Sequence, residues 1–355
     1  MPSTDVSIWG VVLAGGVGSR FWPLSTPSRP KQLLPLVSSQ PLIVDAVRRI
    51  EPLVERERVL VLTNAALRER VREFLPEVPQ EQVLAEPRPA GTAAALTWAA
   101  SLIANRDGPE AVMASVHADW AVLNEEEFRS TLSAAVDAAR RHRALVTVGI
   151  VPSRPDPGFG YIRPGEALSD IAAMPVYRVR EFIEKPDRER AARMVAEGCL
   201  WNSGIFVWRV GDFLEEVKAR CPEVSGALNE CGSDAECFFE RVRSVSVDVG
   251  VLERSPRVLV IPGNFGWDDV GTWAALRRVR PLDSSGNAIS GQVYAVEARN
   301  NVVHAESGTT VVLFGVEGLV VVAVEDGLVL VTTLDKSAEL KELLERLPAT
   351  LRERA

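Results

Sequence analysis

The sequence predicts an α/β protein with a large, mostly parallel sheet, followed by a small all-β domain and a closing helix. In the first half of the chain, short apolar runs alternate with segments of amphipathic helical spacing. This alternation is typical of βαβ units, whose parallel sheet is covered by helices on both faces. Beyond residue 287 the helical segments give way to short valine-rich runs separated by turn residues. A chain of 355 residues is long enough for one large domain and one smaller one.

The elements of the first part follow from hydrophobic periodicity. Strands are expected at Ile8 to Leu13, Val59 to Thr63, Val83 to Ala85, Ala111 to Val116 and Leu145 to Val151. Helices are expected at Leu42 to Ile50, Ala65 to Phe74, Thr92 to Asn105 and Glu125 to Arg141. Two later strands, at Val176 to Glu184 and Leu200 to Trp208, flank a helix at Asp187 to Glu197. This later group is interpreted as a substrate-facing insertion on the same core.

The C-terminal part has a different composition. Arg277 to Gly286 is basic, contains a proline and ends in glycine, which predicts a linker. The valine runs from Ala288 to Thr333 predict a small all-β domain, either a β-solenoid or a small sandwich. Asp335 is expected to cap a final helix. The apolar face of that helix consists of Leu340, Leu343, Leu344 and Leu347.

Charge and cysteine content exclude several classes of protein. A net charge of −8 argues against nucleic acid or an anionic membrane as the main partner. No apolar stretch reaches membrane-spanning length, and no basic segment precedes the first apolar run, so a cytoplasmic protein is predicted. The four cysteines contain no Cys-x-x-Cys pair and the three histidines lie far from them, which argues against zinc and predicts reduced thiols.

A glycine-rich turn follows Leu13 at the carboxyl end of the first expected strand. Gly15, Gly16 and Gly18 would let backbone N–H groups approach a phosphate, at the end of the strand where open α/β sheets bind ligands. Arg20 and Lys31 then add two cations. The combination predicts a nucleotide-phosphate site; the alternative is a tight turn with incidental basic residues.

The two commoner glycine motifs do not fit this turn. Phe21 stands where the dinucleotide fingerprint needs its last glycine, and Ser19-Arg20 follows Gly18 where a P-loop has lysine and serine or threonine. The pattern Gly-Gly-x-Gly-x-Arg, followed by Trp-Pro-Leu-Ser and Pro-Lys-Gln, resembles that of the sugar-1-phosphate nucleotidylyltransferases. More narrowly, it resembles that of their mannose-1-phosphate guanylyltransferases.

The resemblance covers nearly the whole chain and implies a function. It implies transfer of GMP from GTP to mannose 1-phosphate with Mg²⁺, with Arg20, Lys31 and Lys185 as the catalytic cations. It also implies a catalytic domain at residues 1–282 and, at residues 283–355, a left-handed β-helix with a closing helix. A homodimer is expected. The alternatives are another sugar-1-phosphate nucleotidylyltransferase, with a heptose or glucose substrate, and a catalytically silent regulatory paralogue.

Two aspartates are the expected metal ligands, because Mg²⁺ prefers hard oxygen ligands and often takes only two carboxylates beside phosphates. Asp119 follows a strand, and Asp268-Asp269 lies in a Gly-Trp-Asp-Asp-Val-Gly turn. The resemblance selects Asp119 and Asp269. The alternative for Asp119 is a helix cap.

The remaining site residues are assigned by the resemblance. It implies that Lys185 binds the sugar phosphate and that Gly160, Glu184, Asn202 and Gly204 form the sugar site. For the Glu184-Lys185 pair the alternative is a solvated surface pair.

The resemblance also implies a nucleotide site. Its expected members are Leu13, Gly15, Gly16, Gly18, Glu86, Gly91 and Thr92. In this family arginine and asparagine usually precede the threonine, whereas Ala90 and Gly91 stand there in this chain.

Overall fold

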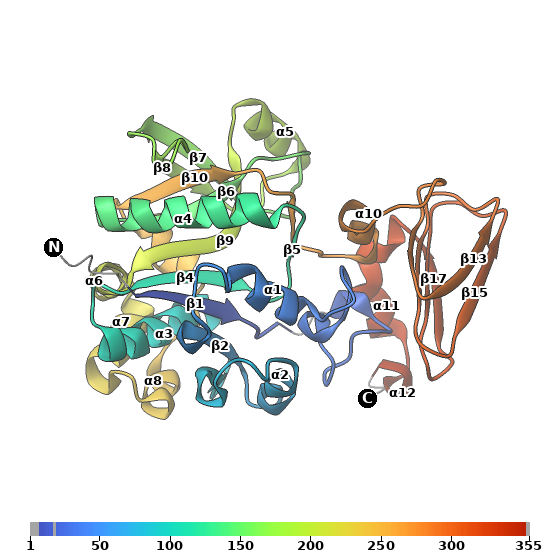
Figure 1. Ribbon diagram of the computed structural model, residues 1–355, viewed down its shortest axis with the longest axis horizontal. Helices are drawn as coiled ribbons and strands as arrows, with labels where there is room; N and C mark the ends of the chain where they lie inside the picture. The colour runs from blue at the N-terminus through green and yellow to red at the C-terminus, as the bar shows by residue number, and fades with distance from the viewer. Residues whose placement is uncertain (1–6, 17–18, 353–355) are drawn as a thin grey trace. The chain divides into compact units, whose positions relative to one another are not determined.

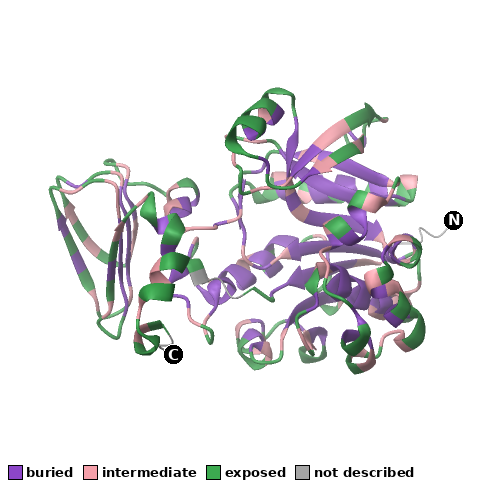
Figure 2. Cartoon of the chain, turned by 180° about the vertical axis from the view of Figure 1, so that it is seen from behind, coloured by how far each residue is buried: buried purple, intermediate pink, exposed green. Residues whose placement is uncertain are grey.

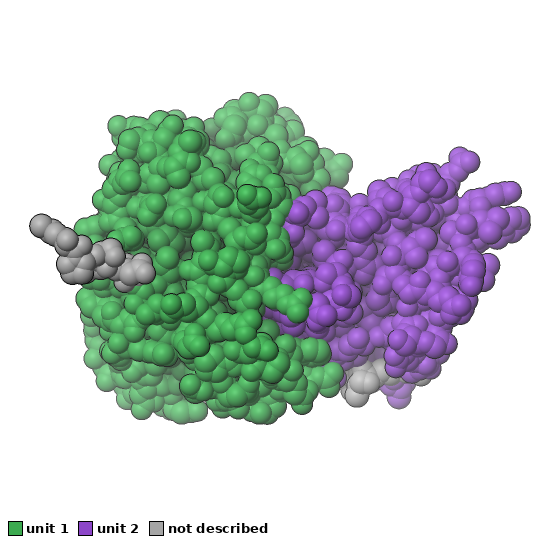
Figure 3. Space-filling view, in the orientation of Figure 1, with its two compact units in different colours: residues 1–15, 46–117, 124–267 green, residues 16–45, 118–123, 268–355 purple. Residues whose placement is uncertain are grey.

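The chain forms two compact units whose segments alternate along the sequence. The structure is a computed structural model that describes residues 7–16 and 19–352. Unit 1 comprises residues 1–15, 46–117 and 124–267, and unit 2 comprises residues 16–45, 118–123 and 268–355 (Figure 3). The segment that follows the first strand therefore belongs to the same compact unit as the C-terminal part of the chain.

Unit 1 is built on a nine-stranded sheet with the order β3-β2-β1-β4-β9-β6-β10-β8-β7 (Figure 1). Its strands are β1 (Ile8–Leu13), β2 (Val59–Asn64), β3 (Val83–Glu86), β4 (Val112–His117), β6 (Leu145–Ile150), β7 (Tyr161–Ala167), β8 (Tyr177–Ile183), β9 (Leu200–Arg209) and β10 (Val258–Gly263). Strands β1 to β4 are parallel, as are β6 and β10, whereas β9 is antiparallel to β4 and β6. Strand β8 is antiparallel to β10 and β7, and β7 is also antiparallel to β9. The predicted α/β sheet is confirmed, with parallel pairing over β1 to β4 and between β6 and β10 and antiparallel pairing elsewhere.

Helices cover both faces of this sheet because their apolar sides need burial. Helices α3 and α6 to α8 share a hydrophobic core with Trp9, Val11 and Leu13 of β1. Helix α4 packs on β4, β6, β9 and β10 on the other face, and Figure 2 shows the strands buried beneath the helices. The helices are α1 (Leu42–Ile50), α2 (Arg68–Phe74), α3 (Gly91–Asp107), α4 (Glu125–His142), α5 (Arg188–Ala196), α6 (Val210–Arg220), α7 (Pro222–Cys231), α8 (Ala235–Arg241) and α9 (Val247–Gly250).

Unit 2 contains the predicted β-helix. Parallel pairing joins β12 to β14 and β14 to β16, and a second face pairs β13 with β15. The last strand, β17, is antiparallel to β16. The strands are β12 (Ala288–Ser290), β13 (Gln292–Val296), β14 (Val302–Ala305), β15 (Thr310–Phe314), β16 (Leu319–Ala323) and β17 (Val329–Thr333).

Short elements complete the chain. They are β5 (Ala121–Val122), β11 (Trp267–Asp268), α10 (Leu276–Val279), α11 (Leu340–Arg346), α12 (Ala349–Arg352) and the 3₁₀ helices η1 (Ser19–Phe21), η2 (Lys31–Leu33), η3 (Arg56–Arg58), η4 (Gln80–Gln82), η5 (Leu252–Arg254), η6 (Trp273–Ala275) and η7 (Lys336–Glu339). Over the described ranges 7–16 and 19–352, no helix is long and apolar enough to cross a membrane.

Two buried asparagines stack at one corner of the β-helix. The Asn301 side-chain amide and backbone N–H both donate to Asn287 Oδ1, at 2.9 and 3.0 Å, and Leu319 N donates to Asn301 Oδ1 at 2.8 Å. Each asparagine therefore satisfies backbone groups that the turn would otherwise leave unpaired in the interior.

The glycine-turn segment of unit 2 packs on the β-helix. Phe21 and Trp22 belong to one buried cluster with Trp273 and with Val302 and Val320 of the β-helix. The Trp273 indole donates to the Trp22 carbonyl at 3.1 Å, and the Phe21 and Trp273 rings lie 5.1 Å apart. The β-helix thus forms part of the hydrophobic core that supports residues 20–36.

Two local predictions in the C-terminal part are wrong. Asp335 makes no side-chain capping hydrogen bond to a described residue, because its backbone is already helical (φ −64°, ψ −46°), whereas a capping residue is extended. Arg277 to Gly286 is not a loose linker: Arg280 is buried and donates to the Leu36 carbonyl at 2.5 Å.

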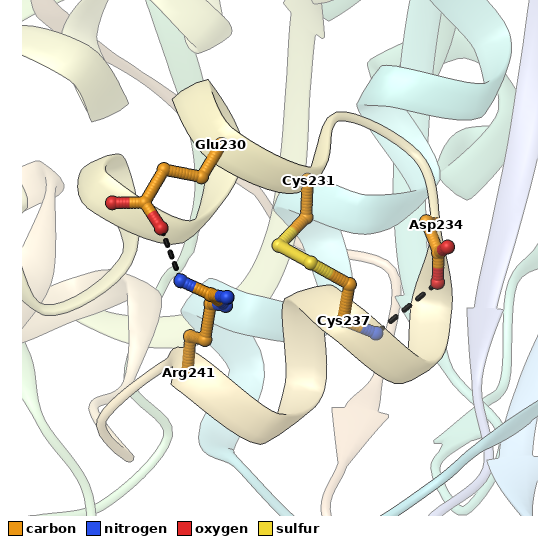
Figure 4. Close-up of a disulfide and its surroundings, with 5 residues drawn as sticks. All are labelled: Glu230, Cys231, Asp234, Cys237 and Arg241. Atoms are coloured by element: carbon orange, nitrogen blue, oxygen red, sulfur yellow. Dashed lines mark hydrogen bonds and ion pairs between the residues drawn. A yellow bond between two sulfur atoms is a disulfide. The ribbon is translucent and has the colours of Figure 1, made fainter.

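The prediction of reduced thiols is wrong for two of the four cysteines. Cys231, at the end of α7, is bonded to Cys237 of α8 (Figure 4). Asp234 caps α8 by accepting from Cys237 N at 3.1 Å, and the tight turn brings the two Cα atoms to 5.6 Å, within disulfide range. Cys199 and Cys221 are free thiols and are buried.

Candidate functional site

Lys31 connects the two predicted metal ligands. Its Nζ donates to Asp119 Oδ2 at 3.0 Å and to the Asp269 backbone carbonyl at 2.6 Å. The lysine side chain is buried, whereas the Asp119 side chain is 36% exposed. Asp119 does not cap α4, whose N-cap is Asn124. Two segments far apart in sequence therefore meet at one cation.

Gln32, the neighbour of Lys31, holds the glycine turn. It is buried, and its Nε2 donates to the Gly16 carbonyl at 2.9 Å. We did not predict this role, although the Pro-Lys-Gln motif contained the residue. Within that motif, the lysine donates to the Asp119 carboxylate and the Asp269 carbonyl, and the glutamine donates to the Gly16 carbonyl.

Arg20 lies in η1 and is exposed, in contrast to the buried Phe21 and Trp22 that follow it. Anchoring by these two aromatic residues leaves the arginine on the surface of unit 2. Gly16 is also exposed. Gly18 lies outside the described residues.

Asp268 and Asp269 have different surroundings although they are adjacent. Asp268 accepts two hydrogen bonds from Arg278, at 2.6 and 3.1 Å, and one from Val270 N at 2.9 Å. The Asp269 carboxylate has no hydrogen-bond donor among the described residues. Val270, which follows it, is a buried β-branched residue at φ 46°, a costly conformation that recurs at functional sites.

The environment of Asp269 favours a cation. Burial raises its pKa, the charges of Asp268 and Asp119 raise it further, and Lys31 opposes them. A divalent ion near Asp119 and Asp269 would relieve both the burial and the repulsion, so these residues fit Mg²⁺. Among the described residues, no group of three or more His, Cys, Asp or Glu side chains could hold a metal, so further oxygen ligands would come from phosphates and water.

In unit 1, two parts of the predicted nucleotide site come together at the carboxyl ends of β1 and β3. A Cβ atom built on Gly15 would lie 3.9 Å from Glu86 Oε1. Partial burial raises the pKa of Glu86 from 4.5 to about 7. Leu13 ends β1 and its side chain lies in the core. The glycine turn and the acidic residue thus share one sheet edge.

Gly91 and Thr92 pack against residues 245–247. Gly91 has φ 79°, and a Cβ atom there would overlap the Val245 carbonyl. The Thr92 hydroxyl accepts from Val247 N at 2.9 Å, so this side chain supports the start of α9. Only glycine allows this close approach.

Three of the four predicted sugar residues line one pocket in unit 1, and the fourth, Gly204, contacts one of them. A Cβ atom on Gly160 would lie 2.7 Å from Glu184 Oε2, and the Gly160 carbonyl accepts from Asn202 N at 2.8 Å. Gly204, at φ 73°, donates its N–H to Asn202 Oδ1 at 3.3 Å. Gly160, Glu184 and Asn202 line a small pocket that is open to solvent.

Lys185 adopts a left-handed backbone conformation, with φ 42°, directly before Pro186. Its Nζ lies 3.0 Å from Glu184 Oε1, and the two side chains are 67% and 57% exposed. An exposed pair of this kind contributes little stability. The positive φ, in contrast, is a strain that the surrounding structure must impose.

Residues 9–285 match the family model for nucleotidyl transferase, and residues 291–347 match the model for the MannoseP isomerase/GMP-like beta-helix domain. The mannose-1-phosphate guanylyltransferase of Escherichia coli K12 is 36% identical over 96% of this chain and 74% of its own length. The chain belongs to the mannose-1-phosphate guanylyltransferase family.

Other similar proteins agree with this membership. A xanthan biosynthesis protein of Xanthomonas campestris pv. campestris is 33% identical over 97% of the chain and 74% of its own length. A crystal structure of mannose-1-phosphate geranyltransferase from Thermus thermophilus has a TM-score of 0.87 and 33% identity, and covers 96% of this chain and 99% of its own.

In this guanylyltransferase-family chain the predicted site residues divide between the two units. Unit 2 carries Arg20, Lys31, Asp119 and Asp269, and unit 1 carries the residues assigned to base, sugar and sugar phosphate. The role of each residue stays a prediction. No signal in the sequence indicated Asp248, which lines the same pocket as Gly160, Glu184 and Asn202. It lies 46 residues after Asn202, in a segment without a recognisable motif.

Proposed function

We propose that the chain transfers GMP from GTP to mannose 1-phosphate, which gives GDP-mannose and pyrophosphate. The observation that carries the chemistry is Lys31, whose ammonium joins Asp119 and the Asp269 segment. Transfer of a nucleotidyl group brings two polyanions together, so the site needs cations and oxygen ligands for a metal. The sugar pocket and the similar guanylyltransferases support the choice of substrates.

In this proposal a phosphate oxygen of mannose 1-phosphate attacks the α-phosphorus of GTP. The bond between the α-phosphorus and the oxygen that links it to the β-phosphorus breaks, and pyrophosphate leaves with the electron pair. The attacking oxygen is already anionic, so no general base is needed. Arg20 and Lys31 neutralise the triphosphate, and Lys185 holds the sugar phosphate. The contribution of the protein is positioning and charge stabilisation.

Asp119 and Asp269 would hold Mg²⁺. When bound, the ion would neutralise charge on the phosphates. Lys31 keeps the two aspartates together and adds a fixed positive charge beside them.

A matrix of substrates tests this function. Pyrophosphate release is measured for GTP, UTP and dTTP, each with mannose 1-phosphate and glucose 1-phosphate. GTP with mannose 1-phosphate should be converted most efficiently. The kcat/KM for GTP should exceed that for UTP or dTTP by more than about tenfold, because a site built for hydrogen bonds rejects a base that leaves the polar groups of the site unpaired. Faster conversion of glucose 1-phosphate with UTP or dTTP than of mannose 1-phosphate with GTP would overturn the assignment of the substrates. Conversion of no pair would support a regulatory paralogue.

Lys185 and Arg20 should affect different substrates. Lys185→Ala should raise the KM for mannose 1-phosphate, and Arg20→Ala the KM for GTP, each by roughly ten- to a hundredfold, because each removes a charge-assisted contact. Arg188→Ala, an exposed cation three residues after Lys185, serves as the control and should change neither KM. Equal effects of either site variant on both substrates would contradict the assignment.

Glu86 should make nucleotide binding depend on pH. With its pKa near 7, the carboxyl group ionises between about pH 6 and 8, and only the ionised form accepts from both guanine N–H groups. Affinity for GTP, measured by calorimetry, should therefore rise over this range more steeply in the wild type than in Glu86→Gln. The variant also corrects for titration of the nucleotide itself.

A stability measurement checks the same variant. The raised pKa means that ionisation of Glu86 opposes folding, and this cost grows as the pH rises from 4.5 to about 7. Glu86→Gln should therefore be at least as stable as the wild type at pH 8. Identical pH profiles of affinity in both proteins would rule out Glu86 as the titrating group.

The assembly and location are further parts of the proposal. A homodimer is supported by an exposed apolar row on β13 and β15, in which Tyr294 pairs with Val312 and Val296 with Phe314; these side chains are 52% to 70% exposed. Sedimentation equilibrium measures this directly. Cytoplasmic location is supported by the supply of GTP there. The family-model matches support the division into residues 1–282 and 283–355.

A further inference from the structure

Asp248 lies at the sugar pocket but belongs to none of the motifs used above. It is the second residue of the short helix α9 and lines the cavity together with Gly160, Glu184 and Asn202. Its Oδ1 accepts from Asn202 Nδ2 at 2.7 Å. A polar contact this short, between a carboxylate and the amide of a proposed sugar-binding residue, places Asp248 within the recognition site.

The hydrogen bond from Asn202 to Asp248 fixes the direction of the Asn202 amide. Nδ2 donates to Asp248, while Oδ1 accepts from Gly204 N at 3.3 Å. Rotation of the amide by 180° would place an NH₂ group against the Gly204 N–H and a carbonyl against the carboxylate. Both contacts would then be repulsive, so only one orientation is compatible with its neighbours.

The backbone around Asp248 is held from two sides. Val247 N donates to Thr92 Oγ1 at 2.9 Å, and Ser246 Oγ accepts from Val249 N at 3.3 Å. Burial raises the pKa of Asp248, with a smaller contribution from Glu184, while Asn202 and His117 oppose this effect. The hydrogen bonds of its neighbours and that of Asn202 therefore hold the carboxyl group at the edge of the pocket.

We propose that Asp248 is a specificity-determining residue for the sugar. It orients the Asn202 amide, and it accepts a hydrogen bond from a hydroxyl group of mannose 1-phosphate in this pocket. The inference rests on the proposed function and deepens it. Sugar hydroxyls are donors that need acceptors at fixed positions. An epimer that directs one hydroxyl elsewhere leaves such an acceptor unpaired, and that penalty is the source of discrimination.

The test compares Asp248→Ala and Asp248→Asn with the wild type by steady-state kinetics. Asp248→Ala should raise the KM for mannose 1-phosphate by about ten- to a hundredfold, with the KM for GTP within about twofold. The preference for mannose 1-phosphate over glucose 1-phosphate, taken as the ratio of kcat/KM values, should fall by about tenfold. Asp248→Asn keeps an acceptor for Asn202 and should recover part of both losses.

Ser246→Ala is the matched control, because it removes the N-cap of the same helix but no atom that lines the pocket. It should keep the sugar preference of the wild type. A loss of preference equal to that of Asp248→Ala would show that Asp248 only supports α9. Unchanged sugar kinetics in Asp248→Ala, or equal rises in both KM values, would also overturn the inference.

Binding measurements separate this inference from the proposed function. Calorimetry with mannose 1-phosphate alone should show weaker binding to Asp248→Ala, while binding of GTP reports that the variant is folded. A wild type that is inactive with GTP and mannose 1-phosphate would refute the proposed function. A wild type that is active beside an Asp248→Ala variant with unchanged sugar affinity would refute only the role of Asp248.

Discussion

Replacing Asp269 by Asn is expected to reduce kcat by roughly a hundred- to a thousandfold without loss of stability. The variant keeps the shape of the side chain but removes a charge that would balance a metal ion, and effects of this size follow when one stabilising group is lost from a transition state. Because the environment raises the pKa of Asp269, its ionised form opposes folding at neutral pH. The neutral variant should therefore unfold at the same temperature as the wild type or higher.

Asp268→Asn is the matched control one residue away. It replaces one of the two carboxylate oxygens that accept hydrogen bonds from Arg278 by an NH₂ donor and removes the charge of a buried ion pair, so its main effect should be a lower unfolding temperature. Calorimetric Tm and kcat across a Mg²⁺ titration distinguish the two variants. Near-normal turnover of Asp269→Asn at low Mg²⁺ would exclude Asp269 as a ligand, and Asp268 would become the candidate.

A chain that ends at residue 282 is expected to be insoluble or inactive. The cluster that contains Phe21, Trp22 and Trp273 is completed by β-helix residues, among them Val302 and Val320. Exposure of each large apolar side chain costs about 1.5–3 kcal/mol, so several together match the typical net stability of a domain, about 5–15 kcal/mol. Arg29, two residues before Lys31, would also lose its ion pair with Glu306, now 2.7 Å long.

The measurements for the truncated chain are soluble yield, mass in solution and kcat. A chain that ends at Leu347 is the control: it lacks α12, whose described residues are all at least partly exposed, and should match the full-length protein. A monodisperse chain of residues 1–282 with the kcat of the full-length protein would contradict the supporting role of the β-helix.

Elements with strong periodicity could be predicted from the sequence. The first strand was predicted at Ile8–Leu13 and is found there, because a run of buried residues in a parallel sheet has few alternative conformations. Three of the residues predicted for the sugar site also lie near one another. Gly160, Glu184 and Asn202 each lie close to the end of a strand, and strand pairing brings these ends into contact.

Contacts between distant segments could not be predicted. Asp248 meets Asn202 only because residues 245–247 pack against Gly91 and Thr92, and no local pattern encodes that packing. The wrong prediction of a helix cap at Asp335 has a local cause. The residue type suits a cap, but the backbone of Asp335 is already in helical conformation. The Cys231–Cys237 pair depends on how the α7–α8 turn closes.

The close approach of Gly91 to Val245 has a consequence for how substrate preference could diverge among related enzymes. Any side chain at position 91 would displace the Val245 carbonyl, and three residues later the same segment carries Asp248. A substitution at Gly91, in the turn proposed to bind the base, would thus also alter the pocket proposed to bind the sugar. Laboratory evolution toward a new nucleotide by substitutions in this turn should therefore also change the sugar preference. Variants with altered preference for both nucleotide and sugar should arise more readily than variants in which only the nucleotide preference is altered.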